Sequence, residues 1–184
     1  AELVSYAAPA LTGISGCTGS GTATTGCARA GGSAITLTGT NFGASDATVF
    51  VGDAQISSVA HDATTPQSKL VFALPAGFGL TRDVLILQSG GQSGTGVSVS
   101  YQPCAAGTAE STSSAACAAC AAGTVSASAG QAACSACAPG TVQPLGGQST
   151  CTACPVGRFV LASGQTQCAN CTDGFYTPSA GLTE

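Results

Sequence analysis

The stretch CAAGTVSASAGQAAC (120–134), followed after two residues by CAPGTVQPLGGQSTC (137–151), decides how the second half of the chain folds. In both segments one glycine stands three residues after the first cysteine and another stands ten residues after it. The same frame begins at Cys104, Cys154 and Cys171, at a period of 17 residues. The first repeat is one residue shorter and has Ser114 in place of the second glycine. The sequence therefore contains five tandem repeats, the last of them open at residue 184.

Covalent staples are expected in these repeats, because each has too few large apolar side chains to build a core. The simplest pairing closes every repeat on itself, which predicts Cys104–Cys117, Cys120–Cys134, Cys137–Cys151 and Cys154–Cys168. Each closed loop would gain about 3 kcal/mol in the chain-entropy description. The two glycines then act as turns that let a short hairpin double back within the loop. Connectivity does not follow from sequence alone, so crossed links such as Cys117–Cys137 stay open.

The segment CTDGFYTPSAGLTE (171–184) is in frame, with Gly174 and Gly181 at the two glycine positions. The chain has 11 cysteines, an odd number. The period places the missing closing cysteine at position 185. We therefore predict that Cys171 pairs with a cysteine beyond residue 184, in a natural chain that continues.

Zinc binding is the alternative for these cysteines, because CAAC (117–120) and CSAC (134–137) have a spacing close to that of zinc ribbons. The cysteines form a tandem frame rather than separate sets of four ligands, and Cys104 would be left over. A secreted chain, moreover, oxidises its thiols. Disulfides are therefore favoured, and no metal or other cofactor is expected. Redox catalysis is disfavoured because no βαβ pattern surrounds a C-x-x-C.

Short β-rich segments separated by turn residues fill the first half. Apolar residues alternate within them, a pattern that predicts half-buried strands of a β-sandwich or barrel in 34–39, 47–52, 69–75, 83–88 and 96–101. The predicted core consists of Ile14, Ile35, Leu37, Phe42, Val49, Val51, Leu70, Phe72, Leu85, Leu87, Val97 and Val99. Cys17 and Cys27 bracket a Gly/Thr/Ser loop without an apolar anchor, and a disulfide there would contribute roughly 2–3 kcal/mol. Two free thiols are the alternative.

The motifs GGSAITLTGTNFG (31–43), VFVGDAQ (49–55), LPAGFG (74–79) and VSVSYQP (97–103) resemble the IPT/TIG family. This resemblance implies an immunoglobulin-like sandwich over residues 8–103. The transcription-factor members of that family use basic loops on DNA, which this chain lacks. The C-x-x-G-x-(Y/F)…G…C-x-x-C frame of 104–184 resembles ephrin-receptor-like cysteine-rich repeats. Phe159 and Tyr176 stand at the aromatic position, whereas the earlier repeats carry Ala109, Val125 and Val142 there.

Residues 1–7 carry a resemblance within the chain, because LVSYAAP (3–9) is similar to VSVSYQP (97–103). They are therefore interpreted either as the last strand of a preceding, similar domain or as a lead-in to the first strand. A detached strand could also complete the sheet of a neighbouring subunit. The expected fold is thus all-β: an Ig-like sandwich in 8–103, then a linear array of disulfide-stapled hairpin repeats in 104–184.

Charged residues make up 7% of the chain, with four basic residues and a net charge of −4. So few cations argue against nucleic-acid binding and against a polybasic membrane patch. The sole histidine, His61, lies in the polar segment HDATTPQS (61–68), so a surface loop is expected and a catalytic triad is not. The sequence GSGTATTG (19–26) lacks the lysine of a phosphate loop. We expect no enzyme.

Sugar is expected to keep so weakly charged a surface soluble. Asn170 heads the sequon Asn-Cys-Thr and is a candidate N-linked site, although a bridged Cys171 would hinder access. The candidate O-linked sites are Ser111, Thr112, Ser113 and Ser114. The expectation is a structural or adhesive segment of a secreted modular surface glycoprotein, of the kind found in mastigoneme-type filaments. Its expected partners are copies of itself, neighbouring domains of the same chain and glycans. The alternative is the ligand-binding ectodomain of a cell-surface receptor.

Overall fold

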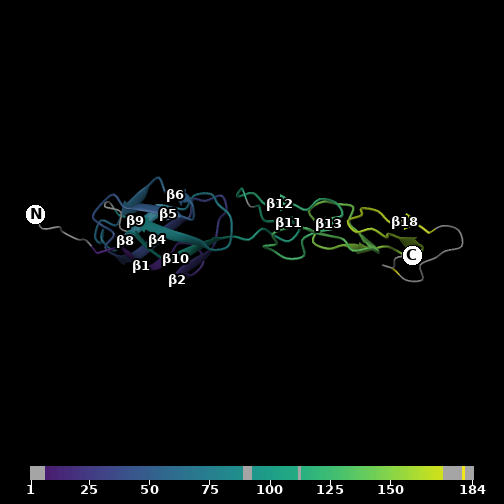
Figure 1. The fold of residues 1–184 in the computed structure, drawn as a ribbon, viewed down its shortest axis with the longest axis horizontal. Helices are drawn as coiled ribbons and strands as arrows, with labels where there is room; N and C mark the ends of the chain where they lie inside the picture. The colour runs from purple at the N-terminus through teal and green to yellow at the C-terminus, as the bar shows by residue number, and fades with distance from the viewer. Residues whose placement is uncertain (1–6, 89–92, 112, 172–179, 181–184) are drawn as a thin grey trace, which may run out of the picture. The chain divides into compact units, whose positions relative to one another are not determined.

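The computed structural model describes residues 7–88, 93–111, 113–171 and 180 (Figure 1). The chain divides into two compact units, Ala1–Gln102 and Pro103–Glu184, which we call the sandwich and the ladder. The division falls one residue before the boundary that the cysteine distribution suggests. Every regular element in the described residues is a β-strand, so the fold is all-β as predicted.

Two five-stranded sheets form the sandwich. The first has the strand order β2-β1-β4-β8-β7, and its strands are β1 (Ala10–Ser15), β2 (Ser20–Gly21), β4 (Ala34–Thr40), β7 (Val59–His61) and β8 (Lys69–Ala73). The second has the order β3-β10-β9-β5-β6, and its strands are β3 (Ala23–Cys27), β5 (Thr48–Val51), β6 (Ala54–Gln55), β9 (Arg82–Leu87) and β10 (Ser93–Tyr101). All neighbours are antiparallel except β3 and β10, which run parallel.

Alternating side chains place the core between the two sheets. In β4, Ile35 and Leu37 are fully buried and lie opposite Phe72 and Leu70 of β8. Ten of the twelve predicted core residues are buried: Ile14, Ile35, Leu37, Phe42, Val49, Val51, Leu70, Phe72, Val97 and Val99. The core also contains residues that the alternation did not single out, namely Cys27, Ala47, Ile56, Leu74, Val84, Ile86 and Tyr101.

The prediction for β9 was wrong by one residue. Leu85 and Leu87 are only half-buried, whereas Val84 and Ile86 are fully buried. The segment VLIL is apolar on both faces, so its own pattern cannot select the buried face. The neighbouring strand selects it, because Val84 and Ile86 lie opposite the buried Val51 and Val49 of β5.

The segment between Cys17 and Cys27 is not the unanchored loop that its composition suggested. It contains β2 and β3, and β3 pairs with β10. Thr24 is fully buried despite its hydroxyl group, because Oγ1 accepts a hydrogen bond from the Cys17 N–H (3.1 Å) and lies 3.4 Å from the Thr18 and Gly19 carbonyl oxygens. A satisfied threonine thus takes the place of an apolar anchor.

Phe42, a predicted core residue, enters the core from the segment after β4 and is fully buried. Asn41 and Gly43 have φ values of 60° and 78°, in the left-handed region. A Cβ on Gly39 would lie 2.6 Å from the Phe42 ring, so no side chain fits there. The local backbone conformation therefore places Phe42, the largest fully buried side chain of the sandwich, in the core.

Four two-stranded sheets make up the regular structure of the ladder in the described residues. They are β11 (Thr108–Ala109) with β12 (Ala118–Ala119), β13 (Thr124–Val125) with β14 (Ser135–Ala136), β15 (Thr141–Val142) with β16 (Thr152–Ala153), and β17 (Arg158–Phe159) with β18 (Ala169–Asn170).

The return strand of each hairpin is the pair of residues inside a C-x-x-C, which corrects one prediction. It does not lie within the bridged loop, because it comes after the closing cysteine. The C-x-x-C spacing thus has a structural role, since two residues are enough for one short strand. The predictions for Gly174, Gly181, Tyr176 and a strand in residues 2–7 lie wholly or mainly outside the described residues.

Candidate functional site

Ten cysteines form five disulfides, each of which closes a short loop. The bridges are Cys17–Cys27, Cys104–Cys117, Cys120–Cys134, Cys137–Cys151 and Cys154–Cys168. The last four are the pairs that closure of each repeat predicts, and the first is the bridge expected across the Gly/Thr/Ser loop. The sulfurs of CAAC (117–120) and CSAC (134–137) belong to three separate bridges, so they supply no set of four zinc thiolates. In the described part of the chain no cluster of His, Cys, Asp and Glu could hold a metal ion.

The two cysteines of each ladder bridge have different surroundings. The opening cysteines Cys104, Cys120, Cys137 and Cys154 are at most 2% exposed. The closing cysteines are half-buried or exposed. Cys171, at the opening position of the fifth repeat, is half-buried and takes part in none of these five bridges. Its pairing with a cysteine beyond residue 184 stays a prediction. Its backbone N–H donates to the Gly157 carbonyl (3.1 Å), as Cys120 does to Gly107 (3.0 Å).

The first glycine of each repeat connects that repeat to the next one. The N–H of Gly107 donates to Ser126 (2.8 Å), that of Gly123 to Gln143 (2.7 Å) and that of Gly140 to Val160 (2.8 Å). In every case the acceptor stands six residues after the opening cysteine of the following repeat. The hydrogen bond therefore recurs at the period of the sequence.

The second glycine connects the same repeats in the other direction. The N–H groups of Gly130, Gly147 and Gly164 donate to the carbonyls of Cys104, Cys120 and Cys137, each at 2.8 Å. The backbone also approaches across two repeats, because a Cβ on Gly123 would overlap the Gly164 carbonyl. Gly107 and the Gly147 carbonyl are related in the same way. The glycines are thus required for close backbone packing as well as for their positive φ values.

The position six residues after the opening cysteine carries a polar side chain in the first three repeats, and it was not identified from the sequence. Ser126 and Gln143 are buried six residues after the opening cysteine, where Val160 stands in the next repeat. The Gln143 side chain donates to the Thr150 carbonyl (2.7 Å) and accepts from the Leu145 N–H (3.1 Å). In the first repeat Glu110 stands there, and its carboxylate accepts from the Cys104 N–H (2.7 Å). In these three repeats the polar side chain at this position forms hydrogen bonds within its own repeat.

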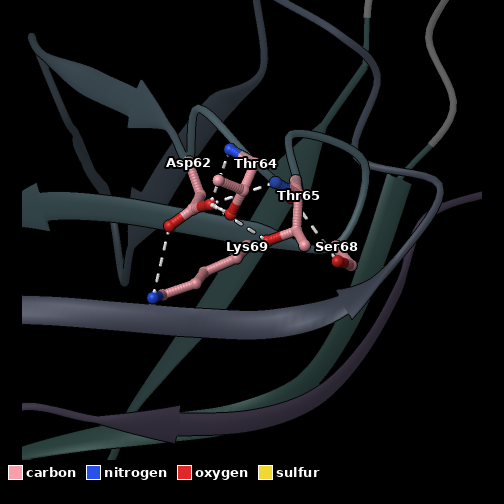
Figure 2. Close-up of polar contacts among 5 residues, drawn as sticks. All are labelled: Asp62, Thr64, Thr65, Ser68 and Lys69. Carbon is pink, nitrogen blue, oxygen red and sulfur yellow. Dashed lines mark hydrogen bonds and ion pairs between the residues drawn. The ribbon is translucent and has the colours of Figure 1, made fainter.

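Asp62 organises the loop between β7 and β8 (Figure 2). One carboxylate oxygen accepts from the backbone N–H groups of Thr64 and Thr65, both at 3.0 Å, and from the Thr64 hydroxyl at 2.6 Å. The other lies 3.3 Å from the Lys69 ammonium. Hydrogen bonds from Thr64, then Thr65 and Lys69, hold the pKa of the Asp62 carboxyl well below its ordinary value. An Asp followed closely by Thr-Thr is the sequence signal of such a turn.

His61 is the last residue of β7 and not part of a surface loop, which corrects the sequence prediction. Its Nδ1–H donates to the Pro66 carbonyl (2.9 Å), and Nε2 accepts from the Ala47 N–H (3.4 Å). Both ring nitrogens are thereby occupied by backbone groups. The ring fastens two loops together, and this arrangement leaves no nitrogen for a nucleophile or a metal.

Of the candidate glycosylation residues that the structure describes, three are exposed and Ser111 is half-buried. Asn170 is exposed at the end of β18. Ser113 and Ser114 are exposed, and their backbone N–H groups donate to the Ser111 hydroxyl (3.2 and 3.1 Å). Thr112 lies outside the described residues.

Residues 24–102 match the family model of the IPT/TIG domain. Residues 140–184 match the model described as tyrosine-protein kinase ephrin type A/B receptor-like. The chain therefore contains an IPT/TIG domain followed by an ephrin-receptor-like cysteine-rich region. No curated protein matches the chain significantly. The bridges and hydrogen bonds extend the second region toward the N-terminus, because the repeats at Cys104 and Cys120 share them.

Both domain types are non-catalytic binding or structural modules. Together with five disulfides, they indicate an extracellular or cell-surface protein in an oxidising environment. Within the described residues, no helix combines the length and the apolar character that a membrane crossing requires.

Proposed function

We propose that the chain is a structural or adhesive segment of a secreted, modular surface glycoprotein and that it serves within an extracellular filament. The observation that carries this proposal is the periodic backbone bonding of the ladder, in which each repeat closes on itself and hydrogen-bonds to the next. In such a stack the repeated spacing of cysteines and glycines produces a regular array of repeats rather than a ligand pocket.

The chemistry of the side chains supports a non-enzymatic role. The sole histidine bonds to backbone groups through both nitrogens, and ten of the eleven cysteines are oxidised. A net charge of −4 spread over scattered side chains offers no patch for electrostatic recognition. Self-association and contacts with neighbouring domains of the same chain are the partners that such a surface suits.

Electron microscopy of the native material tests the filament. We expect ordered fibres that antibodies raised against this chain decorate at a regular spacing. Antibody label on membranes without fibres would contradict the filament and favour the second candidate.

That second candidate is a receptor ectodomain, and the match of residues 140–184 to an ephrin-receptor-like model is the observation that favours it. The sequence of the whole gene product separates the two functions. A single membrane span followed by a kinase-like region would support the receptor, whereas further repeats without a kinase would support the filament.

Glycosylation is part of the proposal, with Asn170 as the N-linked residue and Ser111, Thr112, Ser113 and Ser114 as O-linked residues. The exposure of Asn170, Ser113 and Ser114 supports it. Intact mass of material from the native source, before and after enzymatic deglycosylation, measures the attached sugar. We expect a decrease on N-deglycosylation that the variant Asn170→Gln lacks. An unmodified mass would remove this part of the proposal.

A further inference from the structure

The order of the ladder bridges has a mechanical consequence. Each bridge joins cysteines 13 or 14 residues apart in sequence whose Cα atoms lie 5.6–5.8 Å apart. Only two residues separate the closing cysteine of one bridge from the opening cysteine of the next. A covalent path therefore runs from Cys104 to Cys171 through four bridges and four short links, and it bypasses every loop.

The taut length of this path follows from the geometry. The four bridges span 5.6–5.8 Å each, and each link of three peptide units reaches about 10 Å, so the whole path is taut at about 65 Å. The same residues without bridges would reach about 235 Å when fully extended. The bridges thus shorten the attainable length about 3.5-fold.

The bypassed loops contain many of the groups that hold neighbouring repeats together. Gly123, Ser126 and Gly130 all lie inside the loop closed by Cys120–Cys134. Gly123 and Gly130 donate to neighbouring repeats, and the Ser126 carbonyl accepts from Gly107. Tension along the covalent path therefore cannot straighten the loops that carry these hydrogen bonds.

We propose that the ladder is a tether of fixed maximum length, in which the consecutive disulfides carry the tension and the loops that they close carry none. The inference rests on the pairing of the cysteines and stands whether the segment belongs to a filament or to a receptor. It predicts a property that the proposed structural role does not by itself require, namely a taut length set by covalent bonds rather than by folding stability.

Single-molecule stretching of the full 184-residue chain, held through terminal tags that contain no cysteine, tests the proposal. The fully stretched length is measured with the bridges intact and again after reduction with a phosphine. We expect reduction to lengthen the chain by about 20 nm, of which the ladder contributes about 17 nm and the Cys17–Cys27 bridge about 3 nm. A gain that differs from 20 nm by more than about 3 nm would overturn the proposal.

Two variants assign the length to particular bridges. The pair Cys120→Ser and Cys134→Ser should lengthen the oxidised chain by about 4 nm, and the pair Cys17→Ser and Cys27→Ser by about 3 nm. The stretched length depends on connectivity and not on folding, so a variant that folds poorly still gives a valid result. An oxidised Cys120/Cys134 variant of unchanged length would reject the proposal, whereas an absence of fibres in microscopy would reject only the filament.

Discussion

The sandwich and the ladder are both made of β-strands, but they hold their strands together by different means. The sandwich surrounds a cluster of seventeen buried residues and contains one disulfide. The ladder buries a small cluster of Val142, Cys154 and Val160, and it contains four disulfides. Where apolar side chains are scarce, covalent bonds and close backbone contacts take the place of a core. Each region should therefore be sensitive to a different perturbation.

Reduction should have the largest effect and should separate the two regions. Removal of the four bridges should cost about 3 kcal/mol for each bridge, which is more than the small apolar cluster of the ladder can offset. Amide hydrogen exchange before and after phosphine treatment measures this. The Gly123 and Gly140 amides should lose protection, whereas the Ile35 and Leu37 amides in β4 should keep it. Retained protection in a fully reduced ladder would show that hydrogen bonds alone hold the repeats.

Truncation in β9 comes next and tests which face of that strand is buried. Ile86→Ala removes a fully buried side chain and should reduce the free energy of unfolding by about 2–5 kcal/mol. Its matched control, Leu85→Ala, removes a half-buried side chain of similar size and should cost about 1 kcal/mol or less. Urea unfolding followed by a probe in the sandwich compares the two. Equal losses would contradict the assigned face.

A comparison of two glycines in the ladder separates the cost of a positive φ value from the cost of steric overlap with an added Cβ. Gly123 and Gly147 have φ values of 82° and 73°, so alanine costs about 1–2 kcal/mol at either position. A Cβ on Gly123 would also overlap the Gly164 carbonyl, whereas no atom lies within 4 Å of one on Gly147. We expect Gly123→Ala to lose about 1–3 kcal/mol more than Gly147→Ala. Amide exchange of the Gly140 N–H reports the difference, and identical effects would refute the contact across two repeats.

The smallest effect should come from Asp62, whose half-buried carboxylate stabilises one loop of the sandwich. Because its pKa is lower in the folded chain than the ordinary value of 3.8, its contribution is present above about pH 4 and is lost as the pH falls below that value. Asp62→Ala should therefore lower the melting temperature at pH 7, with a smaller difference from the natural chain at pH 2.5. A difference independent of pH would assign the effect to packing. Ser45→Ala is a suitable control at another surface loop.

Prediction from the sequence succeeded where the governing interactions are local. The period of cysteines and glycines indicated the repeats, because a bridge across about 14 residues constrains only the segment that it closes. Alternation in 34–39 and 69–75 indicated β4 and β8, since each has one apolar face. The two glycine positions were recognised as turns, and the described ones have positive φ values.

It failed where distant segments decide the outcome. β3 has a composition typical of a loop, and it becomes a strand because β10 offers it a partner and because Thr24 finds acceptors for its hydroxyl. His61 was assigned to a loop because nothing near it in sequence reveals that Pro66 and Ala47 would bind its ring. The two residues inside each C-x-x-C were not recognised as a strand, because their partner is the strand after the opening cysteine of the preceding bridged loop.

The sequence by itself determined that this protein has a β-sandwich followed by closed, core-poor repeats, because spacing and alternation act over a few residues. Only the tertiary structure decided which face of β9 is buried, which strand flanks β10 and how close the glycines of different repeats approach. These features depend on backbone groups brought together from positions 20 to 75 residues apart, such as Gly123 with Gln143 and Ala23 with Ser98. The side-chain pattern does not name the partners in such hydrogen bonds, since every residue except proline carries the same backbone donor and acceptor.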